Sequence, residues 1–567
     1  MINLLSNSCM TLIATSKKNI KMIMKIKFYL LPLLFLTMHE SMLAQKADII
    51  LTNGKIFTSD TNNLYVQALA IKGNKIIAAS TDVEIKRLAG DKTQIIDLKG
   101  KTVVPGFNDA HAHVGANYPA YRFKLTDNPL EPTPWTILKD SIAKIVKQLA
   151  AGSFIITSIN PDLLGNPAVR RKALDSIAPQ NPVILETWTG HGRILNSASL
   201  KFFGYNEQTS FKGGRLDKDI KQELSGLLEE YAQYRIGAEL SDKLDRSKII
   251  NDLRAYYEQT AALGITTVQN MCTQHSVQQV TDIYSTEEFP CRVRLMAFPF
   301  TNRNELLLHD WDNLFHSLNR MNYISGVKLI LDGTPVERLA CMRTPYKDKP
   351  NEYGRLNFNG EELKRYMQYC LDHKQQIIIH AVGDSSIVTI IRTMRSLHPD
   401  SFWKDKRLRI EHAEFAVEKT EDISTLKKLG IVIVSNPTHL ALPPIMSARF
   451  KDSKTQYLQA MQTLINNKIP LAIGSDGPFN PFLNIMLATM HPDNPKEAIT
   501  IEQAVIAYTY GSAFAEFREK EKGTLTKGKL ADLVVLSQDI FSIPKELLLS
   551  TKSLLTMIDG KVVYKQQ

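Results

Sequence analysis

Residues 103–113, VVPGFNDAHAH, combine an apolar run with two histidines two positions apart. The apolar run Val103-Val104-Pro105-Gly106-Phe107 indicates a buried β-strand. On a strand, side chains i and i+2 project from the same face, so the rings of His111 and His113 are expected to point together. Two neutral imidazole nitrogens placed in this way can bind one metal ion at about 2.0–2.1 Å. Such a pair is weak evidence alone, because most are structural or lie on the surface.

Seven further apolar segments have the character of parallel strands, and amphipathic segments such as 359–374, 421–430 and 454–467 fit between them as helices. Alternating strand–helix units predict an α/β fold, and eight of them predict a (β/α)8 TIM barrel. The seven segments are ITTVQNM from 265, RVRLMAF from 292, GVKLILDG from 326, QIIIHAVG from 376, LRIEHAEF from 408, IVIVSNPT from 431 and PLAIGSDGP from 470.

The regular spacing breaks once, between the first and second strands, so we expect residues 117–245 to form an inserted lobe over the barrel mouth. Short alternating strands occur near both ends of the chain, with the turn pairs Asn53-Gly54, Gly73-Asn74 and Asp559-Gly560. Neither end is a sufficient sheet alone. We therefore predict that residues 45–104 and 520–567 form one composite β-sandwich domain beside a barrel of residues 105–519.

Residues 1–44 are predicted to be an export signal. Lys25 and Lys27 precede a short apolar stretch, and Ala44 offers a cleavage point before Gln45. The stretch is shorter than the roughly 20 residues of a membrane span, although an uncleaved anchor is the alternative. Met24 is an alternative start to Met1. We expect a periplasmic or extracellular enzyme with no stable membrane span after removal of the signal.

Charge and cysteine content exclude some classes of protein. The net charge of +11 is dispersed, apart from a lysine cluster in residues 1–44, and gives no concentrated surface for nucleic acid. The cysteines form no close pairs, so neither a zinc ribbon nor a disulfide framework is indicated. A small-molecule substrate is the expected partner. The oligomeric state stays open, with a homodimer among the options.

The carboxyl ends of the predicted strands carry a common type of residue. After His111 and His113, the fourth strand contains Lys328, the fifth ends at His380, the sixth at His412 and the eighth at Asp476. Active sites of such barrels lie at the carboxyl ends of the strands. These six residues are therefore predicted to hold one or two divalent metal ions, with zinc favoured. Asp476 would bind the first ion and act as general base by accepting a proton from the metal-bound water, which then attacks as hydroxide. His380 and His412 would bind the second ion.

Lys328 lies within an apolar strand, where an unpaired charge is costly. It could snorkel at the rim or pair with Asp332. Alternatively, its amine adds CO2 to give a carboxylated lysine, whose two oxygens can bridge two metal ions about 3.5–4 Å apart.

The ordered motifs PGFNDAHAH, GITTVQNM, GVKLILDG, HAVGD, RIEHAEF, GSDGP and GKLADLVVL resemble the amidohydrolase superfamily. More narrowly they resemble its YtcJ-like branch, amidohydrolase family 3, which includes proteins like N-substituted formamide deformylase. The resemblance implies the barrel with its small β domain, the six metal ligands with Lys328 carboxylated, and hydrolysis of non-peptide C–N bonds.

The resemblance also implies residues that contact the substrate. His191, in a segment similar to the branch's DGH…NS motif, would act catalytically by polarising the substrate carbonyl, or it packs within the lobe. Asp332 is expected to contact the substrate. Arg338 is expected to bind a substrate carboxylate, or it forms a structural salt bridge. The branch's Asp is Thr189 here, and its SLGSRTA segment reads TPVERLA from 334, so the substrate pocket departs from the pattern while the ligands do not.

The predicted function is metal-dependent hydrolysis of an amide, N-acyl or N-formyl bond in a small molecule. The alternatives are deamination, or phosphotriester or ester hydrolysis, on the same scaffold. A metal-free binding protein is the third reading. Deamination ranks lower because the mononuclear deaminases of the superfamily use HxxE after the fifth strand, whereas His380 is followed by Ala-Val-Gly.

Overall fold

The computed structural model describes residues 46–128, 130–315 and 318–567. The predicted export signal lies outside these residues. Among the described residues, no helix is both long and apolar enough to cross a bilayer.

A parallel sheet of eight strands forms the centre of the molecule, in the order β21-β20-β19-β18-β17-β16-β15-β8. Each predicted barrel segment contributes one strand, which confirms the barrel. The strands are β8 (Phe107–Ala112), β15 (Ile265–Asn270), β16 (Arg292–Ala297), β17 (Asn322–Ile330), β18 (Ile377–Ala381), β19 (Arg409–His412), β20 (Val432–Ser435) and β21 (Leu471–Ile473).

Helices surround this sheet because their apolar stripes cover the outward-facing valines, leucines and isoleucines of the strands. The longest are α7 (Arg246–Ala262), α9 (Gly360–Asp372), α10 (Asp384–Leu397), α12 (Thr420–Leu429) and α16 (Pro481–Met490). α9 begins with a capping box between Asn359 and Glu362. The predicted helix at 454–467 is instead two short helices, α14 (Asp452–Thr455) and α15 (Met461–Asn466).

The first predicted strand is two strands. β7 (Thr102–Pro105) pairs with β22 (Leu533–Leu536) in another sheet, and only β8 belongs to the barrel. The chain changes sheets at Gly106, where a Cβ would lie 2.3 Å from Thr266. The histidine pair therefore lies at the carboxyl end of a separate strand, β8, which follows directly on the β domain.

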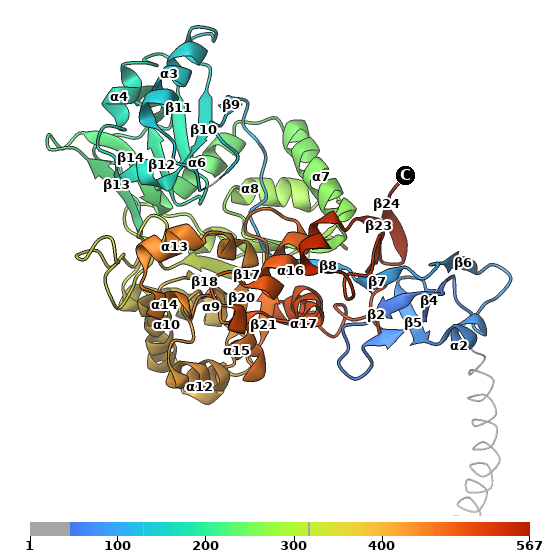
Figure 1. Cartoon of the computed structure of the whole chain (residues 1–567). Coiled ribbons are helices and arrows are strands. Elements are labelled where there is room, and N and C mark those ends of the chain that lie inside the picture. Colours follow the sequence, from blue (N-terminus) through green and yellow to red (C-terminus); the bar gives the residue numbers. More distant parts are fainter. Residues whose placement is uncertain (1–45, 129, 316–317) are drawn as a thin grey trace, which may run out of the picture.

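The β domain combines segments from both ends of the chain (Figure 1). One sheet has the order β5-β4-β1-β6 and the other β24-β23-β22-β7-β2-β3. Their shared core contains Leu51 and Val103 beside Leu533 and Met557. The strands are β1 (Ile49–Thr52), β2 (Lys55–Phe57), β3 (Tyr65–Val66), β4 (Ala68–Lys72), β5 (Lys75–Ser80), β6 (Gln94–Asp97), β23 (Ser553–Ile558) and β24 (Lys561–Lys565).

Two of the three predicted hairpin turns are present, Gly73-Asn74 between β4 and β5 and Asp559-Gly560 between β23 and β24. The third prediction was wrong, because Asn53-Gly54 connects β1 and β2, which lie in different sheets. A Cβ on Gly54 would lie 2.4 Å from Cδ1 of Leu98, so a side chain here would displace the leucine.

A fourth sheet lies between β8 and α7 in the chain, and Figure 1 shows it on one side of the barrel. Its order is β13-β14-β12-β11-β10-β9. The strands are β9 (Tyr121–Phe123), β10 (Ile155–Ile159), β11 (Val183–Thr187), β12 (Gly192–Leu195), β13 (Gly214–Lys218) and β14 (Leu224–Glu230). The inserted lobe is thus a sheet with its own apolar cores on both faces.

Candidate metal centre

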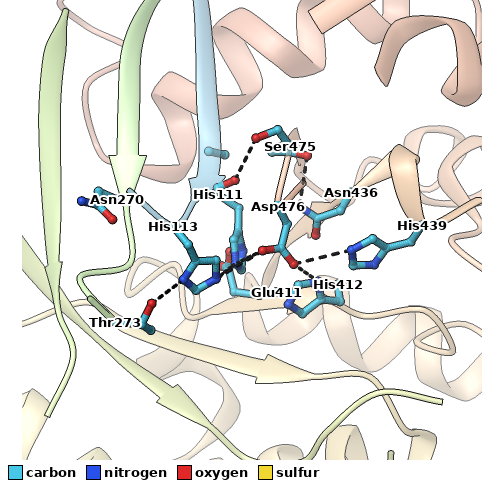
Figure 2. Close-up of polar contacts among 12 residues, drawn as sticks. His111, His113, Asn270, Thr273, Glu411, His412, Asn436, His439, Ser475 and Asp476 are labelled. Atoms are coloured by element: carbon cyan, nitrogen blue, oxygen red, sulfur yellow. Dashed lines mark hydrogen bonds and ion pairs between the residues drawn. The ribbon is translucent and has the colours of Figure 1, made fainter. Parts of the chain in front are cut away.

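The two histidines at the end of β8, His111 within the strand and His113 just after it, share one carboxylate. The Nε2 atoms of His111 and His113 are 3.3 Å apart, and they lie 3.5 Å and 3.2 Å from Oδ1 of Asp476 (Figure 2). This is the convergence that the i, i+2 spacing predicts. The structure therefore brings together residues from the first and last strands of the barrel.

The other ring nitrogen of each histidine is already bonded. Nδ1 of His111 lies 2.7 Å from Oε2 of Glu411, and Nδ1 of His113 lies 2.7 Å from Oγ1 of Thr273. Arg409 donates to both oxygens of Glu411 at 2.9 Å and 3.1 Å. A metal-binding histidine usually has such a partner, which fixes the tautomer and directs the free nitrogen to the ion.

The backbone around Asp476 closes the barrel. Its N–H donates to the carbonyl of His111 at 2.9 Å, and the N–H of Ser475 donates to Oδ1 of Asp109 at 2.8 Å. Asp476 has φ +43°, in the left-handed region. A Cβ at Gly474 would lie 2.4 Å from the Cβ of His111, so β21 reaches β8 only because this residue is glycine.

His380 and His412 complete the same cluster from β18 and β19. Their rings are 4.3 Å apart, and the ring of His412 is 4.8 Å from that of His111. Within the described part of the chain, Nε2 of His380 and Nδ1 of His412 are buried without a hydrogen-bond partner. Burial holds the pKa of both rings well below the usual value, so both are neutral and can donate a lone pair to a metal.

Lys328 is 1% exposed, and its Nζ has no hydrogen-bond partner among the described residues. Burial lowers the pKa of its amine to about 8. The suggested pair with Asp332 is absent, because that carboxylate accepts hydrogen bonds from the N–H groups of Cys341, Val382 and Gly383 and from Ser386 Oγ. A buried amine without a partner is costly, so its position requires an explanation.

Asp332 is fully buried beside His380. Its oxygens accept hydrogen bonds from backbone N–H groups, and its Oδ1 lies 3.8 Å from Nε2 of His380, so the substrate contact stays a prediction. Arg338 differs from the expected carboxylate site, because its Nη2 lies 2.5 Å from Oδ2 of Asp348. Asp348 is bonded in addition to Arg449 at 2.6 Å. This is the structural salt bridge that the sequence left as the alternative.

His191 connects the lobe with the metal cluster. It lies between β11 and β12, and its ring is 5.0 Å from that of His380. Its Nδ1 is 2.9 Å from Oε1 of buried Glu230 and 3.2 Å from the hydroxyl of Tyr234. Burial opposes protonation, but the Glu230 carboxylate outweighs it and raises the pKa of His191. The ring is thus held at the site by the lobe.

His439 and its partners were missed by sequence reasoning. His439 belongs to the 3₁₀ turn η4 (Pro437–Ala441) after β20, and its Nε2 lies 3.5 Å from Oδ2 of Asp476. Its Nδ1 lies 2.9 Å from Oε1 of Glu414. Burial opposes protonation, but Asp476 and Glu414 raise the pKa of His439 to about 10. Its position could have identified His439, because residue 439 directly follows a predicted barrel strand. The motif RIEHAEF could likewise have identified Glu411 and Glu414, which flank His412.

The donor set fits a divalent metal ion. His111, His412 and Asp476 offer ligand atoms within 4.8 Å of one another, and His412, Glu414 and His439 form a second such group. Imidazole and carboxylate ligands suit zinc and related ions. The unbonded nitrogens of Lys328, His380 and His412 face the same region, and a bound ion would satisfy donors that otherwise have no partner.

A parallel eight-stranded barrel with such a cluster at its carboxyl end defines a class of metal-dependent hydrolases. Residues 94–564 match the model of the amidohydrolase family, and the chain belongs to that family. The family membership predicted from the motifs is thereby confirmed.

Three relatives match along nearly their whole length. Protein LONG AFTER FAR-RED 3 of Arabidopsis thaliana is 30% identical over 91% of this chain and 92% of its own. YtcJ of Bacillus subtilis is 27% identical over 89% and 96%. The N-substituted formamide deformylase of Arthrobacter pascens is 24% identical over 92% and 99%.

The fold also matches a solved structure. A metal-dependent hydrolase of uncharacterised activity from Pyrococcus horikoshii aligns with a TM-score of 0.67 and 21% identity, over 88% of this chain and 99% of that one. The likeness concerns the fold alone.

Proposed function

We propose that this metal-dependent hydrolase cleaves a non-peptide C–N bond, of the N-acyl or N-formyl type, in a small molecule. The observation that carries the proposal is the convergence of His111, His113 and Asp476 beside the unbonded nitrogens of Lys328, His380 and His412. The name of the A. pascens relative supports the choice of bond.

The six residues predicted from the strand ends would hold the metal, with zinc favoured. Carboxylation of Lys328 would add an anionic ligand, and burial favours it because it lowers the pKa of the amine and so favours the neutral form that attacks CO2. A bound divalent ion polarises a carbonyl and lowers the pKa of a bound water to about 7.

Residues of the chain then transfer the protons of the reaction. Asp476 accepts a proton from the attacking water through a carboxylate oxygen, the hydroxyl adds to the acyl carbon, and the C–N bond breaks. Asp476 returns the proton to the departing nitrogen, so that the products are an acid and an amine. His191, held by Glu230 through Nδ1, donates from Nε2 to the carbonyl oxygen.

The test is a screen of N-formyl and N-acyl amines with the metal-loaded protein, which scores acid and amine release. His111→Ala and Asp476→Ala should each lower turnover by about a thousandfold or more while the fold persists. His309→Ala, at an exposed site, is the control. Wild-type rates in either site variant would refute the assignment, and release of ammonia alone would favour the deaminase alternative.

We also propose that the protein is exported through its N-terminal signal. The proposal of an export signal is supported by the lysines and the short apolar stretch of residues 1–44. Amino-terminal sequencing of the protein recovered from cells should give Gln45 as the first residue. Recovery of chains that begin at Met1 or Met24 would contradict cleavage.

A further inference from the structure

The two oxygens of Asp476 have different neighbours. Oδ1 faces His111 and His113, whereas Oδ2 lies 3.7 Å from Nδ1 of His412 and 3.5 Å from Nε2 of His439. The backbone of Asp476 is fixed by its bond to the carbonyl of His111. The side chain of Asp476 can still rotate, and a rotation would exchange the positions of Oδ1 and Oδ2.

The ring of His439 is held in three ways. It stacks on His412 with 13° between the planes and 5.3 Å between centroids. Its Nδ1 lies 2.9 Å from Glu414, whose side chain is 5% exposed, and its Nε2 faces Asp476, as Figure 2 shows. Both neighbours are carboxylates, which accept hydrogen bonds, so the ring presents an N–H to each.

We propose that His439 is a positioning residue for Asp476. Its Nε2–H holds Oδ2, so that Oδ1 stays directed at the histidine pair, and Glu414 holds the ring in place. The inference rests on the proposed function only in assuming that Asp476 binds a metal ion. The proposal adds a residue from the loop after β20, the seventh barrel strand, to a site that was predicted from the ends of other strands.

A competing role exists for the same residue. His412, Glu414 and His439 are close enough to hold a metal ion of their own, and Oε2 of Glu414 is buried without a hydrogen-bond partner among the described residues. As a ligand, His439 would need a lone pair on Nδ1 or Nε2. As a positioning residue, it needs a donor at Nε2.

Two isosteric substitutions separate these roles. Glutamine places its amide near the position of histidine Nε2, and asparagine near that of Nδ1. His439→Gln therefore keeps a donor toward Asp476, and His439→Asn keeps one toward Glu414. The same pair of substitutions at exposed His309, which lies 3.0 Å from Asp312, is the matched control.

The full-length variants are loaded with Co²⁺, and we measure bound cobalt, the visible absorption bands of the ion and hydrolysis of formanilide. We expect all variants to bind as much cobalt as the wild type. His439→Gln should keep the wild-type spectrum and lose less than about threefold in kcat. His439→Asn should change the spectrum and lose about tenfold or more in kcat, because a misdirected carboxylate no longer presents Oδ1.

Loss of cobalt from both His439 variants would make His439 a ligand and overturn the proposal. Equal spectra and equal rates for the two would also overturn it, because a merely structural role does not distinguish Nε2 from Nδ1. If the wild type leaves formanilide intact, that compound is not a substrate, and the cobalt spectra alone decide the role of His439. If the wild type binds no cobalt, both the metal-centre assignment and this proposal are wrong.

Discussion

Glu411 shows at the scale of one residue how the site depends on its supports. It is fully buried, it faces Nδ1 of His111, and it receives two bonds from Arg409. Burial opposes its charge, but Arg409 and His111 lower the pKa of Glu411 to about 2. The carboxylate is therefore charged at any working pH and directs the histidine.

Glu411→Gln should lower metal affinity by about 10- to 100-fold, the usual effect of removing a partner of a metal-binding histidine. Competition with a chromogenic zinc chelator measures the affinity. Glu519→Gln is the control, because Glu519 pairs in the same way with Arg407, ahead of the start of β19. Unchanged affinity in Glu411→Gln would contradict the supporting role.

Lys328 gives a second prediction at the residue scale. If Lys328 is carboxylated as proposed, Lys328→Ala should lose most of its bound metal, because the variant lacks the carbamate ligand. Acetate or propionate should restore part of the metal content, since a free carboxylate can replace the carbamate, whereas methylammonium should not. Metal analysis after gel filtration checks this. Full metal content in Lys328→Ala without added acid would contradict the carboxylated lysine.

At the scale of elements, the site depends on how β21 meets β8. Gly474 has no room for a side chain against His111. Gly474→Ala should push the two strands apart, destabilise the fold by about 1–3 kcal/mol and weaken metal binding. Gly165→Ala, where a Cβ would meet nothing within 4 Å, is the control. Chemical unfolding and metal analysis test the pair, and equal behaviour would contradict the close contact.

The elements also show what sequence could predict. Eight strands were predicted because each is an apolar run with a polar residue at its carboxyl end. The split of the first run at Gly106 was not predicted, because nothing in the local sequence shows that the residues on its two sides pair with strands of different sheets. Likewise Asn53-Gly54 has the composition of a hairpin, but its flanking strands join different sheets.

The same reasoning explains the candidate site. The strand ends predicted which residues converge, since parallel strands bring their carboxyl ends to one rim. They could not show that Asp332 accepts hydrogen bonds from backbone N–H groups or that Arg338 meets Asp348, because both depend on loop conformation. The bond between Glu411 and His111 joins residues 300 positions apart, and no local pattern indicates it.

At the scale of the whole molecule, buried neutral histidines govern the response to acid. Burial lowers the pKa of His275, in the loop after β15, from 6.5 to about 4. The unfolded chain therefore binds a proton in this window that the folded chain does not. The stabilisation is complete above pH 6.5 and is lost as the pH falls toward 4.

Between pH 7 and pH 4, the wild type should lose up to about 3 kcal/mol more of its free energy of unfolding than His275→Gln, which cannot take up the proton. Urea unfolding at both pH values measures the difference. His309→Gln, at an exposed position, is the control for the substitution. Parallel losses in the wild type and His275→Gln would contradict this assignment.

The whole molecule brings distant strand ends together in the candidate metal centre, and the metal content of the protein tests that assignment most directly. The protein is purified without chelator, dialysed against metal-free buffer and analysed by mass spectrometry of its elements. We predict close to two equivalents of a divalent ion per chain, mainly zinc, and a large loss in His111→Ala. A wild-type protein that stays free of divalent metal after incubation with zinc would contradict the account.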